Sequence, residues 1–353
     1  MLTQTWTIEG NGFHFGQHGL GQEETSATFP SDSLFAALLA RLAVLRGKDA
    51  VTEFMAPFLQ HEPPFVLTST FPMAGAVRFF PLPLSAQRAS PSKDSAQPVK
   101  QLKKVAFLSE KLFLEILAGK TLLEIYQNAR TLQAGQLLFH PSENNLLPDH
   151  LQKLPSPDIW HIEQRPRVTL GRSAQQSTIF FTGRLAFAQD CGLWFAVRWL
   201  NQEPSLQALL ESLLHDLADA GLGGERSVGF GAFCLHTGAP LSIPPASSAN
   251  TWVSLSRYNP SPEEMPALQA AQSSYNIHTV TGWLETPARR GLRRRPLRLL
   301  AEGSVFGPLP EDVPGRILDV RPDYAKDTRP LDHPVYRCGL AFKVGIQTPG
   351  GQP

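Results

Sequence analysis

The sequence predicts an α+β protein in which strands alternate with two strongly amphipathic helices. Two segments, 31–45 and 203–220, carry leucines and phenylalanines at helical spacing. Other segments show alternating or short apolar runs bounded by Gly and Pro, which is typical of strands. With 353 residues, the chain is long enough for two ordinary domains and a substantial core.

The first elements are a strand, a loop and a helix. Residues 3–8 alternate as a strand, and a Gly- and His-rich loop follows at 11–21. The helix begins at Ser31 or Asp32, because either side chain can cap it. Its apolar side carries Leu34, Phe35, Leu38, Leu39, Leu42 and Leu45.

Further strands and a second helix complete the first half. Short apolar runs at 65–71 and 77–80 predict strands, and the Pro- and Ser-rich stretch 81–98 predicts a long mobile insertion. Two more strands, at 178–187 and 193–200, are predicted to form a hairpin with each other.

A helix over 203–220 is predicted because leucines recur there at i, i+3, i+4, i+7, i+8 and i+11, and a strand follows at 230–236. The first 240 residues therefore follow the order β-α-β-β-α-β with a large insertion after the first helix, which is the ferredoxin-like order.

The second half is mostly strand in pattern. Residues 241–250, rich in Pro, Ser and Ala, predict a linker to this half. Candidate strands lie at 252–258, 277–284, 297–305 and 336–346, with Arg-rich and Pro-rich connections between them.

The composition narrows the function classes. A formal net charge of +1 means that any nucleic-acid site must come from local clusters of Arg and Lys. Three widely spaced cysteines, Cys191, Cys234 and Cys338, predict neither a disulfide framework nor a zinc site, which suits a reducing cytoplasm. The N-terminal residues form no secretory signal, and no segment is apolar enough to span a membrane.

Residues 221–231 form the most informative motif, because five glycines surround Arg226 directly after a helix and before a strand. Glycine permits positive φ and lets a phosphate approach backbone N–H groups, while Arg226 can give phosphate a bidentate contact. Dinucleotide fingerprints and P-loops run strand, glycine loop, helix, so this order excludes them. The loop therefore predicts a site for a nucleic-acid backbone, and a Gly C-cap running into a bulged strand explains only part of it.

With these elements in order, the chain resembles the RAMP superfamily of CRISPR effector proteins. Within it, the match is to the fourth subunit of the Csm complex, the type III-A effector. The resemblance is carried by residues 13–38, 165–172, the glycine loop, 279–283 and 336–340. It implies two ferredoxin-like, RRM-like domains, at 1–240 and 250–353, with a glycine-rich loop and a thumb-like insertion at about 82–165.

The resemblance also implies a function. Such a subunit binds the 5′ tag of crRNA, kinks the guide with its thumb, and docks the large polymerase- and cyclase-like signature subunit beside an adjacent backbone RAMP subunit. Catalysis is not expected of it, and no cofactor, metal or membrane contact is expected. Two alternatives stay open: a repeat-processing endoribonuclease of the same superfamily using His14, and the equivalent capping subunit of a type III-B complex.

The candidate RNA-binding residues fall into five groups. They are the loop after the first strand (His14, Gln17 and His18), the exit of the insertion (Lys100, Lys103 and Lys104), an arginine cluster (Arg165, Arg167 and Arg172, with Thr169 and Ser173), the glycine loop (Gly221, Gly223, Gly224, Arg226, Ser227 and Gly229), and a second arginine run (Arg289, Arg290, Arg293 and Arg294).

Each group has an ordinary alternative. The Arg165 cluster can instead form surface pairs with Glu163 and Asp158. The second arginine run fits the crRNA or an acidic face of a neighbouring subunit equally well. Two tryptophans, Trp194 and Trp199, are expected in the core rather than as stacking platforms.

Overall fold

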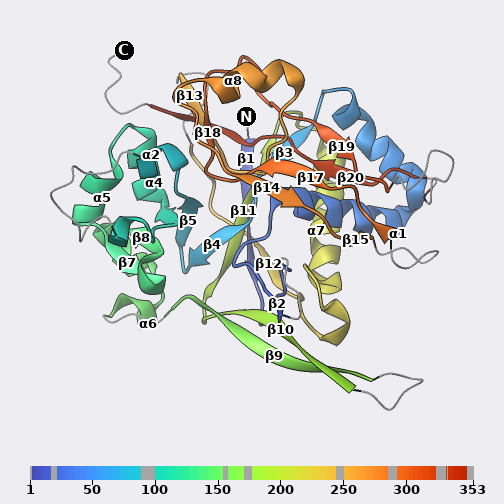
Figure 1. Ribbon diagram of the computed structural model, residues 1–353, viewed down its shortest axis with the longest axis horizontal. Helices are drawn as coiled ribbons and strands as arrows, with labels where there is room; N and C mark the ends of the chain where they lie inside the picture. The colour runs from blue at the N-terminus through green and yellow to red at the C-terminus, as the bar shows by residue number, and fades with distance from the viewer. Residues whose placement is uncertain are drawn as a thin grey trace.

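The computed structural model describes residues 2–16, 22–88, 100–153, 158–170, 177–243, 250–284, 292–322, 331 and 333–347. It is a mixed α+β fold, as predicted, and Figure 1 shows strands running through its centre with helices on both sides.

A nine-stranded sheet forms the centre of the molecule, in the order β12-β1-β11-β4-β5-β6-β8-β7, with β3 also pairing with β11. Strand β1 lies antiparallel to both β11 and β12, so the first and last strands of the N-terminal half are neighbours. The strands span Leu2–Glu9 (β1), Phe65–Leu67 (β3), Phe71–Ala74 (β4), Val77–Pro81 (β5), Phe107–Ser109 (β6), Arg130–Leu132 (β7), Leu137–Phe139 (β8), Cys191–Trp199 (β11) and Cys234–Thr237 (β12).

Two long helices pack together beside this sheet (Figure 1): α1, Ser31–Leu59, and α7, Pro204–Ala220. An ion pair between Arg41 and Asp216 joins them. Helix α1 changes direction at Gly47, whose φ of 82° and ψ of −180° are not helical. The predicted apolar side of α1 is buried through Leu42, but Leu45, close to this bend, is 50% exposed.

The residues of the expected insertion form a separate lobe, on the left in Figure 1. Its strands β6, β7 and β8 extend the central sheet, since β6 pairs with β5 and β8 pairs in parallel with β6. Its helical elements are α2 (Leu84–Arg88), α4 (Glu110–Leu117), α5 (Leu122–Asn128), η1 (Gln133–Gly135), η2 (Pro141–Leu146) and α6 (Asp149–Gln152).

The prediction of a hairpin between 178–187 and 193–200 is wrong. Strand β10, Ser177–Phe187, pairs with β9, Trp160–Leu170, along its whole length, while β11 pairs with β1, β3 and β4. The turn between β10 and β11, where Asp190 has a φ of 55°, sends the chain from one sheet into another. The β9–β10 hairpin, with the short β2 (Gln22–Glu23) beside it, projects from the body (Figure 1).

The C-terminal half consists of short strands. Strand β13, Thr251–Ser254, lies between β18, Val305–Phe306, and β21, Lys343–Ile346. The remaining strands form two-stranded ribbons: β14 (Ile277–Val280) with β17 (Leu297–Leu300), β15 (Trp283–Leu284) with β16 (Leu292–Arg293), and β19 (Ile317–Asp319) with β20 (Tyr336–Cys338). Its helical turns are η5 (Pro262–Glu264) and α8 (Met265–Gln269).

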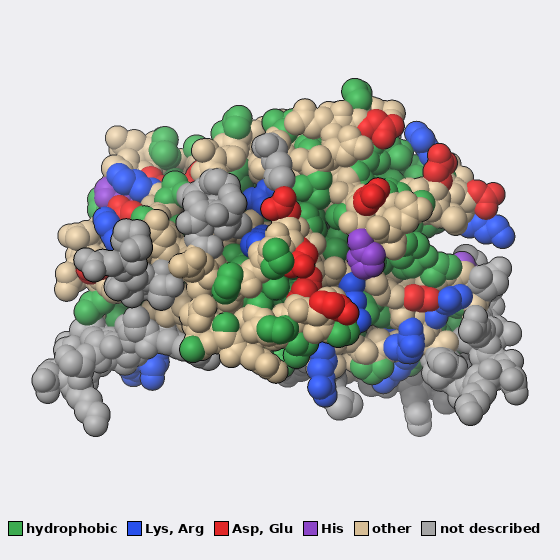
Figure 2. Space-filling view, turned by 90° about the horizontal axis from the view of Figure 1, so that it is seen from above, with side chains coloured by type: hydrophobic (Ala, Val, Ile, Leu, Met, Phe, Trp, Pro, Cys, Tyr) green, Lys and Arg blue, Asp and Glu red, His purple; other side chains and the backbone are tan. Residues whose placement is uncertain are grey.

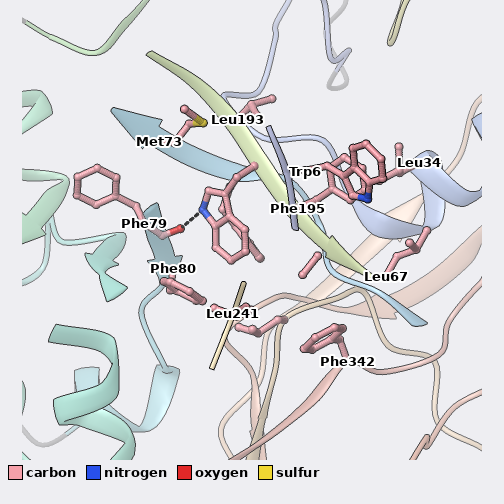
Figure 3. Close-up of a cluster of buried hydrophobic side chains, with 14 of the residues drawn as sticks. Trp6, Leu34, Leu67, Met73, Phe79, Phe80, Leu193, Phe195, Leu241 and Phe342 are labelled. Atoms are coloured by element: carbon pink, nitrogen blue, oxygen red, sulfur yellow. Dashed lines mark hydrogen bonds between the residues drawn. The ribbon is translucent and has the colours of Figure 1, made fainter. Parts of the chain in front are cut away.

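One continuous hydrophobic core joins the two halves, because Phe342 of the C-terminal half packs with residues of the central sheet (Figure 3). The Trp194 indole N–H donates to the Phe79 carbonyl oxygen at 2.9 Å. Trp194 and Trp199 are 0% and 2% exposed, so their assignment to the core is confirmed.

Polar side chains at the start of α1 make a second link between the halves. The predicted capping by Ser31 or Asp32 is wrong, since Pro30 is the N-cap residue and gives no side-chain bond. Asp32 is instead fully buried and accepts from Arg337 Nη1 at 2.9 Å, while Ser31 Oγ accepts from the Arg257 N–H at 2.9 Å. Burial raises the pKa of the Asp32 carboxyl, against the opposing effect of Arg337.

The surface matches the balanced composition. Figure 2 shows acidic and basic side chains interspersed on the face above α8, with exposed apolar groups among them. All three cysteines are free thiols, as expected. Among the residues described, no helix combines the length and apolar character needed to cross a bilayer.

Candidate nucleic-acid interface

The glycine loop begins where α7 ends. The Gly221 N–H closes the helix by donating to the Leu217 carbonyl at 2.8 Å. Four of the five loop glycines have positive φ, between 86° and 92°: Gly221, Gly223, Gly229 and Gly231. Glu225 also has a positive φ, 57°, which a non-glycine residue rarely adopts. The loop is therefore a tightly turned segment that depends on glycine at several positions.

Backbone hydrogen bonds hold this loop against the segment that follows β1. The Gly224 N–H donates to the His14 carbonyl, and the Gly231 N–H donates to the Gly12 carbonyl, both at 2.8 Å. A Cβ on Gly223 would lie 2.5 Å from the His14 carbonyl oxygen, so a side chain cannot fit there. Part of the glycine content thus serves close backbone packing, while Gly221 ends the helix as the C-cap that the ordinary alternative predicted.

The crest of the loop faces outward. Arg226–Val228 form a 3-10 turn, and Arg226, Ser227, Val228 and Gly229 are exposed. A Cβ on Gly229 would meet no atom within 4 Å. This crest therefore combines a guanidinium, a hydroxyl and open backbone, which are groups that contact phosphate and ribose.

His14 lies beneath this loop rather than at its surface. The ring is 5% exposed, and Nδ1 lies 2.8 Å from the Gly183 carbonyl oxygen of β10. Its backbone pairs with Gly223, so His14 connects the glycine loop to the hairpin. Contact of its side chain with RNA stays a prediction, while Gln17 and His18 lie outside the described residues.

The arginines of the β9–β10 hairpin are paired with carboxylates. Arg165 Nη2 lies 2.6 Å and Arg184 Nη1 3.3 Å from Glu163 Oε2, and His161 Nε2 lies 2.9 Å from Glu163 Oε1. These hydrogen bonds, from His161 first and then Arg165 and Arg184, lower the pKa of Glu163 to about 2. The alternative of a surface pair with Glu163 is thus present for Arg165.

A second set of contacts joins the hairpin to the glycine loop. Arg167 Nη2 lies 3.8 Å from Glu225 Oε2, and its guanidinium lies 5.6 Å from the centre of the Phe230 ring. The Arg184 guanidinium approaches the same ring at 6.0 Å. The structure therefore brings two predicted groups, the arginine cluster and the glycine loop, into one surface.

The sequence missed three residues of this surface, Arg184, Glu225 and Phe230, and did not show that Glu163 accepts from two arginines. Arg184 was detectable, because it is a lone cation within the otherwise apolar and small residues of β10. Its position opposite Glu163 depends on the β9–β10 register, which the sequence pattern did not supply.

The other predicted groups lie elsewhere. Lys100, Lys103 and Lys104 are exposed on the segment between α2 and β6, in the left-hand lobe of Figure 1 and away from α7. Arg293 and Arg294 belong to the β16 segment of the C-terminal half. Arg172, Ser173, Arg289 and Arg290 lie outside the described residues. The roles proposed for all of these residues stay predictions.

In the described part of the chain, no three His, Cys, Asp or Glu side chains are grouped to hold a metal ion.

Comparison with known proteins shows which proteins this chain is similar to. A model of the CRISPR Csm4 C-terminal domain matches residues 247–346. Csm4 of Mycobacterium tuberculosis (strain H37Rv) is 27% identical over 326 residues, which cover 92% of this chain and 91% of that protein. Csm4 of Thermococcus onnurineus (strain NA1) is 23% identical, with coverage of 91% and 92%.

Solved structures share the fold. A chain of the Csm3-Csm4 subcomplex in the type III-A CRISPR-Cas interference complex matches with a TM-score of 0.67, at 15% identity, covering 97% of this chain and 99% of that one. A chain of the Csm1-Csm4 cassette in complex with pppApA matches with a TM-score of 0.57, at 18% identity, covering 99% and 100%. The family match, the curated relatives and the shared fold thus all support a Csm4-like RAMP subunit.

Proposed function

We propose that this subunit binds the 5′ tag of crRNA in a type III-A complex and docks the large signature subunit, without catalysing a reaction itself. The observation that carries the RNA part is the exposed crest of the glycine loop, where Arg226, Ser227 and Gly229 stand beside the hairpin arginines. RNA tags are bound largely through phosphate, 2′-OH and splayed bases, and such a crest offers partners for the first two.

The partners follow from the relatives. The similar chains come from a Csm3-Csm4 subcomplex and from Csm1-Csm4 cassettes. By analogy, this subunit contacts a backbone RAMP subunit and the large signature subunit, in the cytoplasm. Two ferredoxin-like domains are part of the same proposal, and the order β12-β1-β11-β4 with α1 and α7 supports the first of them.

A non-catalytic role is supported by the placement of His14. A general acid or base must reach the RNA within hydrogen-bonding distance, whereas this ring is 5% exposed and its Nδ1 lies at a backbone carbonyl. The repeat-processing endoribonuclease therefore lacks an accessible candidate at the position that the sequence suggested for it.

The test is affinity purification of the tagged chain from its native host, with sequencing of bound RNA and identification of bound proteins. Guides sharing one 5′ end, together with a large polymerase-like subunit, are expected. Arg226→Ala should reduce the guide recovered, whereas Arg46→Ala, an exposed arginine of α1, should not.

Different results identify different errors. Recovery of normal tagged guides with the double variant Arg226→Ala and Arg172→Ala would rule out the assigned RNA-binding sites. It would not affect the resemblance to the family. If the purification recovers neither RNA nor partner proteins and the isolated chain cleaves repeat RNA, the protein is instead the repeat-processing endoribonuclease. Recovery of type III-B subunits as the bound proteins would place this subunit in a type III-B complex instead.

A further inference from the structure

Trp283 is the tryptophan of this chain that faces solvent. The chain has six tryptophans, and the structure describes all of them. Five are at most 5% exposed, whereas Trp283 on β15 is 61% exposed. An indole that folding leaves exposed keeps a large aromatic face available to a ligand.

The surroundings of Trp283 are cationic. The Arg293 guanidinium, on the paired strand β16, lies 4.3 Å from the centre of the Trp283 ring and stacks on it. Arg294 Nη2 donates to the Thr281 carbonyl at 2.9 Å, and Arg295 Nη2 donates to the Asp319 carbonyl. Carbonyl acceptors carry no formal charge, so these contacts leave the positive charge of both guanidiniums in place.

This arrangement differs from the hairpin, where Arg165, Arg167 and Arg184 each face a carboxylate. Along the chain, no Asp or Glu occurs between Pro287 and Leu300. Arg294 and Arg295 contact carbonyl oxygens in the described part of the chain. An exposed indole beside such guanidiniums is a combination that binds single-stranded nucleic acid, because bases stack on the ring and phosphates approach the cations. A protein partner would have to supply both acidic groups and an apolar pocket for the ring, so single-stranded RNA fits this surface more simply.

We propose that Trp283, held by Arg293, is a stacking platform for an unpaired base of single-stranded RNA, at a site distinct from the glycine loop. The β15–β16 ribbon lies at the right-hand end of the C-terminal ribbons in Figure 1. Arg293 fixes the indole orientation on one side, and Arg294 and Arg295 attract the flanking phosphates. The inference rests on the proposed RNA-binding function and extends it to the C-terminal half.

The burial of the other tryptophans gives a direct readout. The full-length chain is titrated with a short oligouridine while tryptophan emission and acrylamide quenching are recorded. RNA should quench the emission and protect the quencher-accessible ring, which is Trp283. Trp283→Leu should abolish this signal and weaken binding by about fivefold to a hundredfold, as expected for one stacked base. Trp283→Phe keeps an aromatic face and should retain most of the affinity.

The other outcomes separate this inference from the proposed function. Oligouridine binding that leaves emission unchanged and is equal in wild type and Trp283→Leu overturns the platform but keeps the RNA-binding subunit. Protection of Trp283 by a protein partner in the absence of RNA also overturns it. If wild type binds no RNA, alone or in the complex purified from its host, both proposals fall.

Discussion

Two glycines of the loop have nearly equal φ but different neighbours. Gly223, with a φ of 92°, leaves no room for a Cβ, while Gly229, with a φ of 91°, faces open space. Gly229→Ala should lower the free energy of unfolding by about 1–2 kcal/mol, which is the left-handed strain alone. Gly223→Ala should lower it by a further ~1–3 kcal/mol because the Cβ meets the His14 carbonyl.

Urea unfolding of the two variants provides the comparison, with each acting as the control for the other. Equal losses of unfolding free energy in the two variants would mean that the segment around His14 moves aside at no cost. The contact with His14 would then not fix the loop.

In the proposed RNA-binding role, Glu163 would compete with RNA for the hairpin arginines. Its carboxylate accepts from Arg165 and Arg184, so Glu163→Gln should release both guanidiniums for phosphate. RNA affinity should increase, and the logarithm of the binding constant should fall more steeply with the logarithm of salt, by about one to two units of slope, because two guanidiniums become available. Glu53→Gln removes the same charge from the exposed side of α1 and is the matched control. Weaker binding by Glu163→Gln would show that the carboxylate orients the arginines for RNA.

Acid should weaken the same cluster. The pKa of Glu163 is lowered to about 2 in the folded protein, from an ordinary value of 4.5. Since the folded-state pKa is depressed, its contribution to stability is complete above about pH 4.5 and is lost as pH falls through about 2. Melting temperatures of wild type and Glu163→Gln should therefore converge between pH 5 and pH 2, and added salt should reduce the difference at neutral pH. A constant difference across this range would contradict the shift.

Among the elements, periodic segments were predictable and strand partners were not. Leucine spacing located α7 at Pro204–Ala220, within one residue of the expected helix. Strands β10 and β11 are adjacent in sequence, yet they belong to different sheets, because pairing is decided by distant partners. For the same reason the contacts of the glycine loop with the hairpin, which join Glu225 to Arg167 and Phe230 to Arg167 and Arg184, could not be predicted from the sequence.

The projecting hairpin carries an apolar pair that the fold does not use. Val168 and Ile179 lie opposite each other in the β9–β10 register and are 56% and 64% exposed. Replacing both by Thr keeps strand preference, so the free energy of unfolding should change by no more than about 0.5 kcal/mol. Guide recovery from the native complex should nevertheless fall if this exposed pair contacts the guide.

Leu185, on the same face of the hairpin but fully buried, is the matched control. Leu185→Thr should destabilise the protein by about 2–4 kcal/mol, since it exchanges buried apolar contacts for a hydroxyl. Strong destabilisation by the exposed pair would instead mean that Val168 and Ile179 pack against the body.

At the scale of the whole molecule, side chains from the two halves pack together in one cluster of buried residues. The core is continuous across them, and the buried pair of Asp32 and Arg337 connects the start of α1 to β20. This pair explains why the sequence signal of a capping Asp was misleading: the carboxylate serves a partner that is 305 residues away.

The two members of this pair should respond differently to mutation. Asp32→Ala leaves the Arg337 guanidinium buried and charged, because Arg keeps its proton, and should lower the free energy of unfolding by about 3–5 kcal/mol. Arg337→Leu leaves Asp32, whose pKa burial already raises, so the carboxyl can neutralise by taking up a proton. The loss caused by Arg337→Leu should therefore shrink from pH 7 to pH 5, while that of Asp32→Ala should not shrink over this range.

Urea unfolding of both single variants and of the double variant, Asp32→Ala with Arg337→Leu, gives a double-mutant cycle for this pair. The double variant should be more stable than the sum of the single losses predicts, because neither charge is then left without its partner. Additive losses that do not depend on pH would show that the two side chains act separately, and the link between the halves would then rest on the apolar core around Phe342.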